Sequence, residues 1–304
     1  MTNMQKQTMG LSEWILLVVL SVLWGGSFFF IKIVLKDLQP LTVVLSRVSL
    51  AAIALTTFVF LKGKRMPISP SLWGEFLVMG ILNNLLPFSL IVWGETHIDS
   101  GLAAILNATT PVFTVVLAHF LTQDERLTPN RIVGILLGLC GVVVLVGLEA
   151  LHRIGMNSLG QVAILGAACS YGCAGIYGRR FKRFSPEVAA AGMLTGTAIM
   201  MLPLVLILEH PWTLSPSAAT WEAVLGLSLL STAIAYLIYF HLLAVAGATN
   251  LLLVTFLIPV SALGLGVFIL GEQLQWTEFF GMVLIFAGLA AIDGRLVDRI
   301  QQLI

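Results

Sequence analysis

The stretch that decides the fold occurs twice in this chain. Residues 98–147 read IDSGLAAILNATTPVFTVVLAHFLTQDERLTPNRIVGILLGLCGVVVLVG, and residues 247–292 repeat them in outline as GATNLLLVTFLIPVSALGLGVFILGEQLQWTEFFGMVLIFAGLAAI. Pro111 aligns with Pro259 and Glu125 with Glu272, so the offset is 148 residues at the prolines and 147 at the glutamates. Because this offset is about half of the 304 residues, the sequence predicts two copies of one structural unit.

The composition predicts that lipid surrounds both copies. Hydrophobic residues make up 58% of the chain and charged residues only 10%, whereas soluble domains carry about 25% charged residues. A soluble fold could not bury so much apolar surface, so a lipid bilayer is the expected partner. The net charge of +1 gives no reason to expect nucleic acid, and the three cysteines lie in apolar stretches without a CxxC pair, so no structural disulfide is expected.

Ten apolar runs are long enough to cross a bilayer, which takes roughly 20 helical residues. The first run, from about Trp14 to Val34, lacks the small-residue site of a cleavable signal, so we expect it to remain in the mature protein. The sequence therefore predicts an all-α integral membrane protein, with one five-helix repeat in residues 1–148 and a second in residues 149–304. The predicted spans cover approximately residues 12–35, 41–61, 73–94, 99–121, 129–148, 159–178, 187–208, 219–241, 248–270 and 276–292.

The basic residues orient these spans, because positively charged loops are retained in the cytoplasm. With the N-terminus inside, twelve Lys and Arg residues fall on the cytoplasmic side, and only Lys36, Arg153 and the nearby Lys32 fall toward the other. Both termini of a multi-pass protein of the bacterial plasma membrane are therefore predicted to be cytoplasmic, and the two five-span repeats are inverted. The twelve residues are Lys6, Lys62, Lys64, Arg65, Arg126, Arg131, Arg179, Arg180, Lys182, Arg183, Arg295 and Arg299.

Several motifs give the chain the pattern of a known family. WGGSFFFIKIVL (24–35) lies in the first span, and QPLTVVLSRVSLAAIAL (39–55) opens the second with a proline and, seven residues later, an arginine. A proline-containing span, a glutamate and a glycine-rich span then follow one another in both repeats. Together these motifs resemble the EamA type of the drug/metabolite transporter superfamily. The resemblance implies a ten-helix secondary transporter, often an exporter of amino acids, related metabolites or drugs.

Polar side chains near the middle of the spans mark the predicted substrate site, because a polar group in lipid needs a cavity or a partner. Polar character recurs at equivalent positions of the two repeats, so we expect a cavity between them at the midplane, where alternating access would carry a small molecule across. The alternatives are that Ser and Thr bond to the preceding turn and that Asn bridges helices. The equivalent pairs are Trp24 and Tyr171, Asn83 and Ser231, Asn84 and Thr232, and Asn107 and Thr255; all except Ser231 are predicted to bind substrate.

Arg47 is the only charged residue predicted well inside a span, where a charge costs about 2.5–3.5 kcal/mol on insertion scales. No carboxylate is expected at the same depth, so a substrate anion or backbone carbonyls are its available partners. Arg47 could anchor the carboxylate of an amino-acid-like ligand, or it could reach toward the outer surface or cap a neighbouring helix. Leu194 falls near the matching position, so Arg47 breaks the symmetry of the repeats.

Three prolines inside spans, Pro87, Pro111 and Pro259, each free a carbonyl one turn earlier. They predict kinks, which could act as hinges or remain static. Small residues predict close packing of the fifth span against the tenth, as a scaffold within the chain or in a homodimer: Gly134, Gly138, Gly141, Gly281 and Gly288. Tryptophans close to span ends fit an aromatic belt: Trp73, Trp93, Trp212, Trp221 and Trp276.

Other functions find less support in the sequence. Glu95, His97 and Asp99 lie in an outer loop, where they could couple transport to protons but are more commonly just solvated. The chain has no nucleotide-binding motif and no catalytic or metal-ligand constellation, so no cofactor, metal site or catalytic residue is expected. A membrane enzyme or a receptor without flux therefore stands well behind a transporter, and multidrug or cationic compound efflux is the alternative to amino-acid export.

Overall fold

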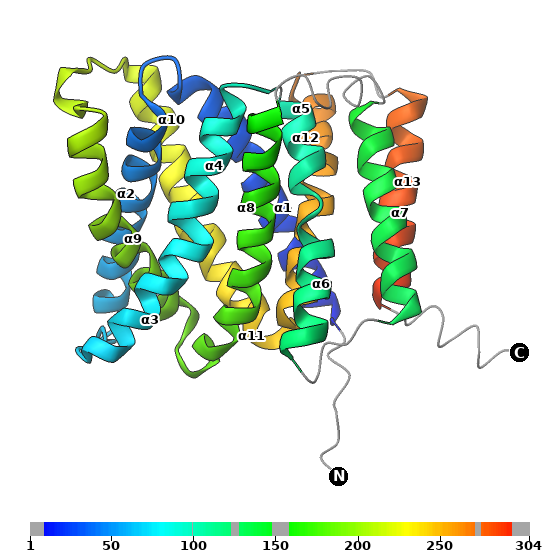
Figure 1. Ribbon diagram of the computed structural model, residues 1–304, viewed down its shortest axis with the longest axis horizontal. Helices are drawn as coiled ribbons and strands as arrows, with labels where there is room; N and C mark the ends of the chain where they lie inside the picture. Colours follow the sequence, from blue (N-terminus) through cyan, green and yellow to red (C-terminus); the bar gives the residue numbers. More distant parts are fainter. Residues whose placement is uncertain (1–8, 99, 123–127, 148–157, 271–274, 294–304) are drawn as a thin grey trace, which may run out of the picture.

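The computed structural model describes residues 9–98, 100–122, 128–147, 158–270 and 275–293, which form helices joined by short connections (Figure 1). No strand occurs among these residues. The first repeat contains α1 (Leu11–Val34), α2 (Pro40–Leu61), α3 (Pro70–Gly80), η1 (Ile81–Leu85), α4 (Leu86–Glu95), α5 (Ser100–Asn107), α6 (Thr110–Leu121) and α7 (Pro129–Val146). The second contains α8 (Ser158–Gly178), η3 (Arg179–Arg183), α9 (Pro186–Leu208), η4 (Pro211–Thr213), α10 (Ala218–Ser228), η5 (Leu229–Ile234), α11 (Ala235–Leu252), α12 (Val254–Leu270) and α13 (Trp276–Asp293).

The helices correspond to the predicted spans. Eight helical runs of the described chain are long and apolar enough to cross a membrane. The eighth run, Ala218–Leu252, also takes in the start of the ninth predicted span, because the chain reverses at Gly247, where φ is 82°, without a longer loop. With the apolar helices α12 and α13, the described residues account for ten spans, and the prediction of an all-α membrane protein with two five-helix repeats is confirmed.

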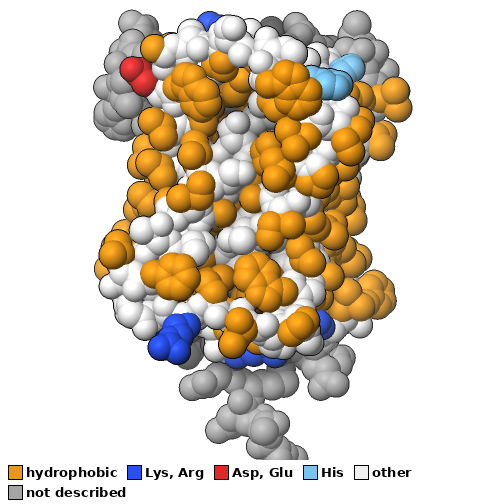
Figure 2. Space-filling model, turned by 90° about the vertical axis from the view of Figure 1, so that its left-hand side faces the viewer, with side chains coloured by type: hydrophobic (Ala, Val, Ile, Leu, Met, Phe, Trp, Pro, Cys, Tyr) orange, Lys and Arg blue, Asp and Glu red, His pale blue; other side chains and the backbone are white. Residues whose placement is uncertain are grey.

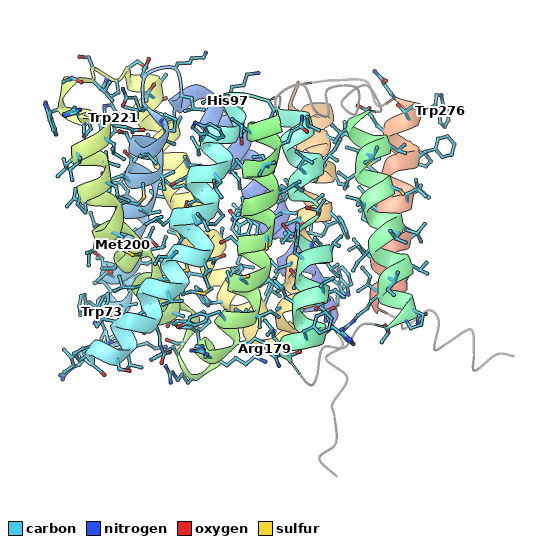
Figure 3. All side chains as sticks on the ribbon, viewed as in Figure 1. Trp73, His97, Arg179, Met200, Trp221 and Trp276 are labelled. Carbon is cyan, nitrogen blue, oxygen red and sulfur yellow. The ribbon has the colours of Figure 1, made fainter. Side chains whose placement is uncertain are left out.

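The surface has the layering of a membrane protein. α1 begins and α13 ends at the same edge of the bundle, the lower one in Figure 1. Hydrophobic side chains cover the face shown in Figure 2, and Lys and Arg gather mostly at its lower edge. Trp73 lies toward the lower edge, and Trp221 and Trp276 lie toward the upper one (Figure 3), as an aromatic belt requires. Some residues used in the predictions lie outside the described ranges: Lys6, Asp99, Glu125, Arg126, Arg153, Glu272, Arg295 and Arg299.

Glycines bring α7 and α13 into backbone contact at one side of the bundle (Figure 1). A Cβ atom at Gly288 would lie 2.6 Å from the carbonyl oxygen of Gly134, and a Cβ at Gly141 would lie 2.8 Å from the carbonyl oxygen of Gly281. Each helix therefore approaches the other more closely than any side chain would allow. The predicted packing of the fifth span against the tenth is confirmed as a contact within one chain.

At the upper edge, each repeat caps a helix of the other. Glu209, which follows α9, accepts hydrogen bonds from the backbone N–H groups of Leu41 (2.8 Å) and Thr42 (2.6 Å) in the first turn of α2. Asp37, which follows α1, accepts one from the N–H of Ser217 (2.9 Å), the residue before α10. These N–H groups have no partner within their own helices. The two carboxylates therefore join the repeats at this edge.

At the lower edge, two ion pairs also join the repeats. Lys64, which follows α2, lies with its Nζ 2.7 Å from Glu187 Oε1 in the first turn of α9. Arg183, which precedes α9, pairs with Glu75 in α3. Both basic side chains are exposed, and exposed ion pairs contribute only about 0–1 kcal/mol. The repeats are thus joined by polar contacts at both edges.

Candidate functional site

Two π-helical turns interrupt the third and eighth spans at equivalent positions of the repeats. η1 contains Asn83 and Asn84, and η5 contains Ser231 and Thr232. These are the two polar pairs that the sequence repeat relates to each other. A π-helical turn widens the helix and disturbs its regular hydrogen-bond pattern, and such turns are frequent at functional sites. The polar pairs therefore coincide with a matched irregularity of the backbone.

A cavity of ≈ 50 Å³ lies between the repeats. Five of the predicted substrate-binding residues line it: Trp24 from α1, Arg47 from α2, Asn107 from α5, Tyr171 from α8 and Thr255 from α12. A space of this size holds a few water molecules, so a larger ligand requires the surrounding helices to move apart. The remaining lining is almost entirely apolar: Ser27, Ile31, Phe88, Ile91, Val92, Leu252 and Ile258.

The structure holds Arg47 in the interior, with only 5% of the residue exposed. Its Nε donates to Thr232 Oγ1 at 2.7 Å, and its Nη2 donates to the carbonyl oxygen of Ser231 at 3.2 Å. The guanidinium carbon lies 3.8 Å from the centroid of the Phe88 ring, a cation–π arrangement. Backbone and hydroxyl oxygens of the second repeat are thus its partners, and it does not reach the outer surface. The other guanidinium N–H groups have no hydrogen-bond partner among the described residues, and the side chain lines the cavity.

Asn107 supplies a hydrogen-bond acceptor to the cavity in which Arg47 supplies donors. It is the last residue of α5, is 7% exposed, and its Oδ1 is buried without a hydrogen-bond partner in the described part of the chain. The equivalent Thr255 donates its hydroxyl proton to the carbonyl oxygen of Leu252 at 2.9 Å and keeps free lone pairs. α5 and α6 are separate helices within one predicted span, and discontinuous helices are typical of substrate sites in transporters.

The amides of η1 lie outside the lining of this cavity. Asn84 Nδ2 donates to Thr197 Oγ1 at 3.2 Å, and Asn84 Oδ1 accepts from the Tyr236 hydroxyl at 2.6 Å. The same hydroxyl lies 3.0 Å from the backbone oxygen of Asn83, so its one proton is shared between the two acceptors. The two asparagines therefore link η1 to α9 and α11, as expected if Asn bridges helices. A direct substrate role for either amide remains a prediction. Thr232 also lies outside the lining and contacts the site through Arg47.

The three prolines occupy different positions relative to the irregular turns. Pro87 is the second residue of α4, which follows η1, and the Asn83 carbonyl that it leaves without an i+4 donor accepts the bond from Tyr236. Pro111 lies in the first turn of α6, immediately after the break in the fourth span, and Pro259 lies inside α12. Motion at any of these positions remains a prediction.

Aromatic rings fill the space between the cavity and the lower edge. The Trp24 ring lies 6.3 Å from that of Tyr236 and 6.1 Å from that of Tyr239, measured between centroids. Sequence reasoning missed both tyrosines and Phe88, because only Trp24 and Tyr171 were selected among the aromatic residues of the apolar runs. Only the offset of 148 residues, which relates Phe88 to Tyr236, could have indicated them. Toward the lower edge the series of ring contacts continues through Phe240, Phe181, Phe76 and Phe184.

Of the predicted acidic and histidine cluster, His97 lies near the upper edge (Figure 3), and Asp99 lies outside the described residues. Glu95 ends α4, one turn from the cavity residues Ile91 and Val92, and its Oε1 is buried without a hydrogen-bond partner among the described residues. His97 is exposed and lies 3.0 Å from the carbonyl oxygen of Trp93 through its Nδ1 (Figure 3). In the described ranges no three His, Cys, Asp or Glu side chains come together in a group that could hold a metal ion.

The comparisons with known proteins agree with this architecture. An uncharacterized transporter of Bacillus subtilis, YoaV, is 28% identical over 90% of this chain and 94% of its own length. A probable amino-acid metabolite efflux pump of Escherichia coli is 28% identical over 92% of this chain and 94% of its own length. One crystal structure superimposes with a TM-score of 0.76 at 21% identity, covering 95% of this chain and 99% of that protein. The model of the EamA-like transporter family matches residues 12–147 and again residues 158–292, and the chain belongs to this family.

Proposed function

We propose that this transporter exports amino acids or closely related small metabolites by alternating access through the central cavity. The observation that carries the proposal is the presence of Arg47 and Asn107 in one cavity between the repeats. A guanidinium with unused N–H groups fits a carboxylate, and charge-assisted bonds of this kind are the stronger ones. An amide oxygen without a partner fits an amino group. Together they complement the two ends of a zwitterionic amino acid.

The remaining walls favour an apolar side chain on the ligand. Phe88, Ile91 and Val92 from α4 face Leu252 and Ile258 from the second repeat across the cavity. A few polar groups placed in an apolar pocket are the usual design of a small-molecule site. A neutral amino acid with a small apolar side chain is therefore the substrate class that fits best.

The inverted repeats support the proposed mechanism. We expect the contacting aromatic rings from Trp24 to Phe240 to close the lower side of the cavity in this conformation. In a pair of inverted repeats, exchanging the conformations of the two halves opens one side and closes the other. With the predicted orientation in a bacterial inner membrane and cytoplasmic termini, opening the lower side would admit substrate from the cytoplasm.

Efflux of cationic compounds finds less support. The lining of the cavity contains an arginine and no carboxylate, so a cation would meet a like charge inside a desolvated space. The relative described as a probable amino-acid metabolite efflux pump favours the amino-acid alternative.

Transport by purified protein in liposomes tests the proposal. Counterflow of labelled L-valine should exceed that in protein-free liposomes, and an imposed pH gradient shows whether protons contribute. The panel should include nucleosides, sugars and a cationic dye. Flux of the dye without flux of any amino acid would replace amino-acid export by drug efflux.

A further inference from the structure

Both π-helical turns are held by side chains from the opposite repeat, and η1 also bonds to Thr197 and Ser170. Arg47 of the first repeat donates to the Ser231 carbonyl and the Thr232 hydroxyl in η5. Tyr236 of the second repeat donates to the Asn83 carbonyl and the Asn84 side chain in η1. At the offset of 148 residues, Ser231 is equivalent to Asn83 and Thr232 to Asn84, so both turns are held at the same two positions.

The two holding groups differ in their access to the cavity. Arg47 lines it, and its guanidinium is the group that the proposed substrate carboxylate would bind. Tyr236 is buried and lies outside the lining, so a ligand in the cavity has no direct route to its hydroxyl. A ligand in the cavity can therefore reach Arg47, which holds the turn in the eighth span. It cannot reach Tyr236, which holds the turn in the third span.

A carboxylate bound to the unused guanidinium N–H groups would draw the Arg47 side chain toward the cavity and so compete with its bonds to η5. A carboxylate is a stronger acceptor for Arg than a neutral carbonyl or hydroxyl oxygen. When Arg47 turns toward it, the Ser231 carbonyl and the Thr232 hydroxyl lose their donor. Thr232 keeps its bond to the Leu227 carbonyl (2.7 Å), so η5 would lose its hydrogen bonds to Arg47 while remaining helical and packed against α1 and α2.

We propose that the bond between Arg47 and η5 is a lock that the substrate carboxylate opens, freeing the eighth span to bend at its π-helical turn while Tyr236 holds the third span. Thr232 then acts as a positioning residue, which holds the guanidinium until substrate arrives. This inference rests on the proposed function, because it requires a carboxylate-bearing substrate. A ligand shifts a conformational equilibrium only if it binds one state more tightly than the other. Opening of the lock would give the substrate such a preference.

Amide hydrogen exchange over residues 229–236 measures the lock directly. Thr232→Val removes the acceptor of the Arg47 bond and also the hydroxyl that donates to the Leu227 carbonyl, and it should speed exchange roughly tenfold or more, since a hydrogen bond to a charged group is lost. Ser231→Ala is the matched control, because the Ser231 Oγ has no hydrogen-bond partner among the described residues, and it should exchange like the wild type. Thr232→Ser should restore slow exchange.

Ligands distinguish a lock from a merely structural contact. In the wild type, saturating L-valine should speed exchange over 229–236 and leave 81–85 unchanged, whereas L-valinamide, which lacks the carboxylate, should not. Thr232→Val should bind L-valine several-fold more tightly, because the carboxylate no longer competes with the lock. A variant that is only destabilised would bind more weakly.

The outcomes separate the two proposals. If L-valine binds to the wild type but leaves exchange over 229–236 unchanged or slower, the lock is overturned and the proposed function stands. Weaker binding of L-valine by Thr232→Val also overturns the lock. If neither L-valine nor any other amino acid of the panel binds, both proposals are overturned.

Discussion

Replacing Arg47 by alanine should reduce transport of L-valine far more than transport of L-valinamide. The two ligands share the amino group and the side chain, and only the first has a carboxylate. Arg47 also holds Thr232 and Ser231 and stacks on Phe88, so its loss will disturb the cavity for both ligands. The ratio of the two effects isolates the interaction with the carboxylate.

The expected size of this ratio follows from the environment of the guanidinium. A hydrogen bond to a charged group is worth about 1.5–3 kcal/mol, and each 1.4 kcal/mol corresponds to roughly a factor of ten. Arg47 is 5% exposed, so solvent screens the interaction little. We therefore expect kcat/KM for L-valine to fall roughly 10- to 100-fold more than for L-valinamide in Arg47→Ala.

Counterflow in proteoliposomes provides both values on the same preparation. Arg47→Lys keeps the charge without the planar fork, so it should retain part of the preference for L-valine. Equal losses for L-valine and L-valinamide in Arg47→Ala, with folded protein confirmed by size-exclusion chromatography, would refute the role of Arg47 as a carboxylate anchor.

Three further predictions concern stability and the second ligand contact. Asn107→Ala should remove the discrimination between L-valine and 3-methylbutanoate, which lacks the amino group; competition in the counterflow assay measures it, and an unchanged preference would contradict the contact. Gly288→Ala should lower the thermal unfolding midpoint, because its Cβ would lie 2.6 Å from the Gly134 carbonyl oxygen, while Gly74→Ala, with nothing within 4 Å, serves as control. Hydrogen bonds from Thr220 and Ser217 lower the pKa of Asp37 from 3.8 to about 2. Because this pKa is depressed on folding, the cap stabilises fully above pH 4 and is lost as the pH falls toward 2. Asp37→Asn should therefore unfold at lower temperature at pH 7 and approach the wild type as the pH falls to about 2; a constant difference across this range would contradict the cap.

The repeat and the hydropathy pattern were sufficient to predict the fold. Apolar runs of spanning length reveal helices in lipid, and the glycines that meet between α7 and α13 were visible as equivalent positions of the two copies. The positions at which the helices turn or become π-helical could not be predicted from the repeat and the hydropathy pattern. The turn at Gly247 and the π-helical segments η1 and η5 depend on packing between repeats, and no periodicity in one chain segment encodes them.

The candidate site shows the same limit. Symmetry pointed to Trp24, Asn107 and Tyr171, which line the cavity, because a polar or amphipathic residue in lipid requires a special environment. The same rule selected Asn84, whose partners are side chains of α9 and α11. Sequence alone cannot tell a cavity from a partner helix, since either satisfies the same polar group.

The most direct test of the central claim is a structure of the protein with its best-transported amino acid bound. The predicted result is a ligand between the repeats, with its carboxylate on Arg47 and its amino group on Asn107 Oδ1. A ligand bound outside this cavity, or one whose carboxylate faces away from Arg47, would contradict the account.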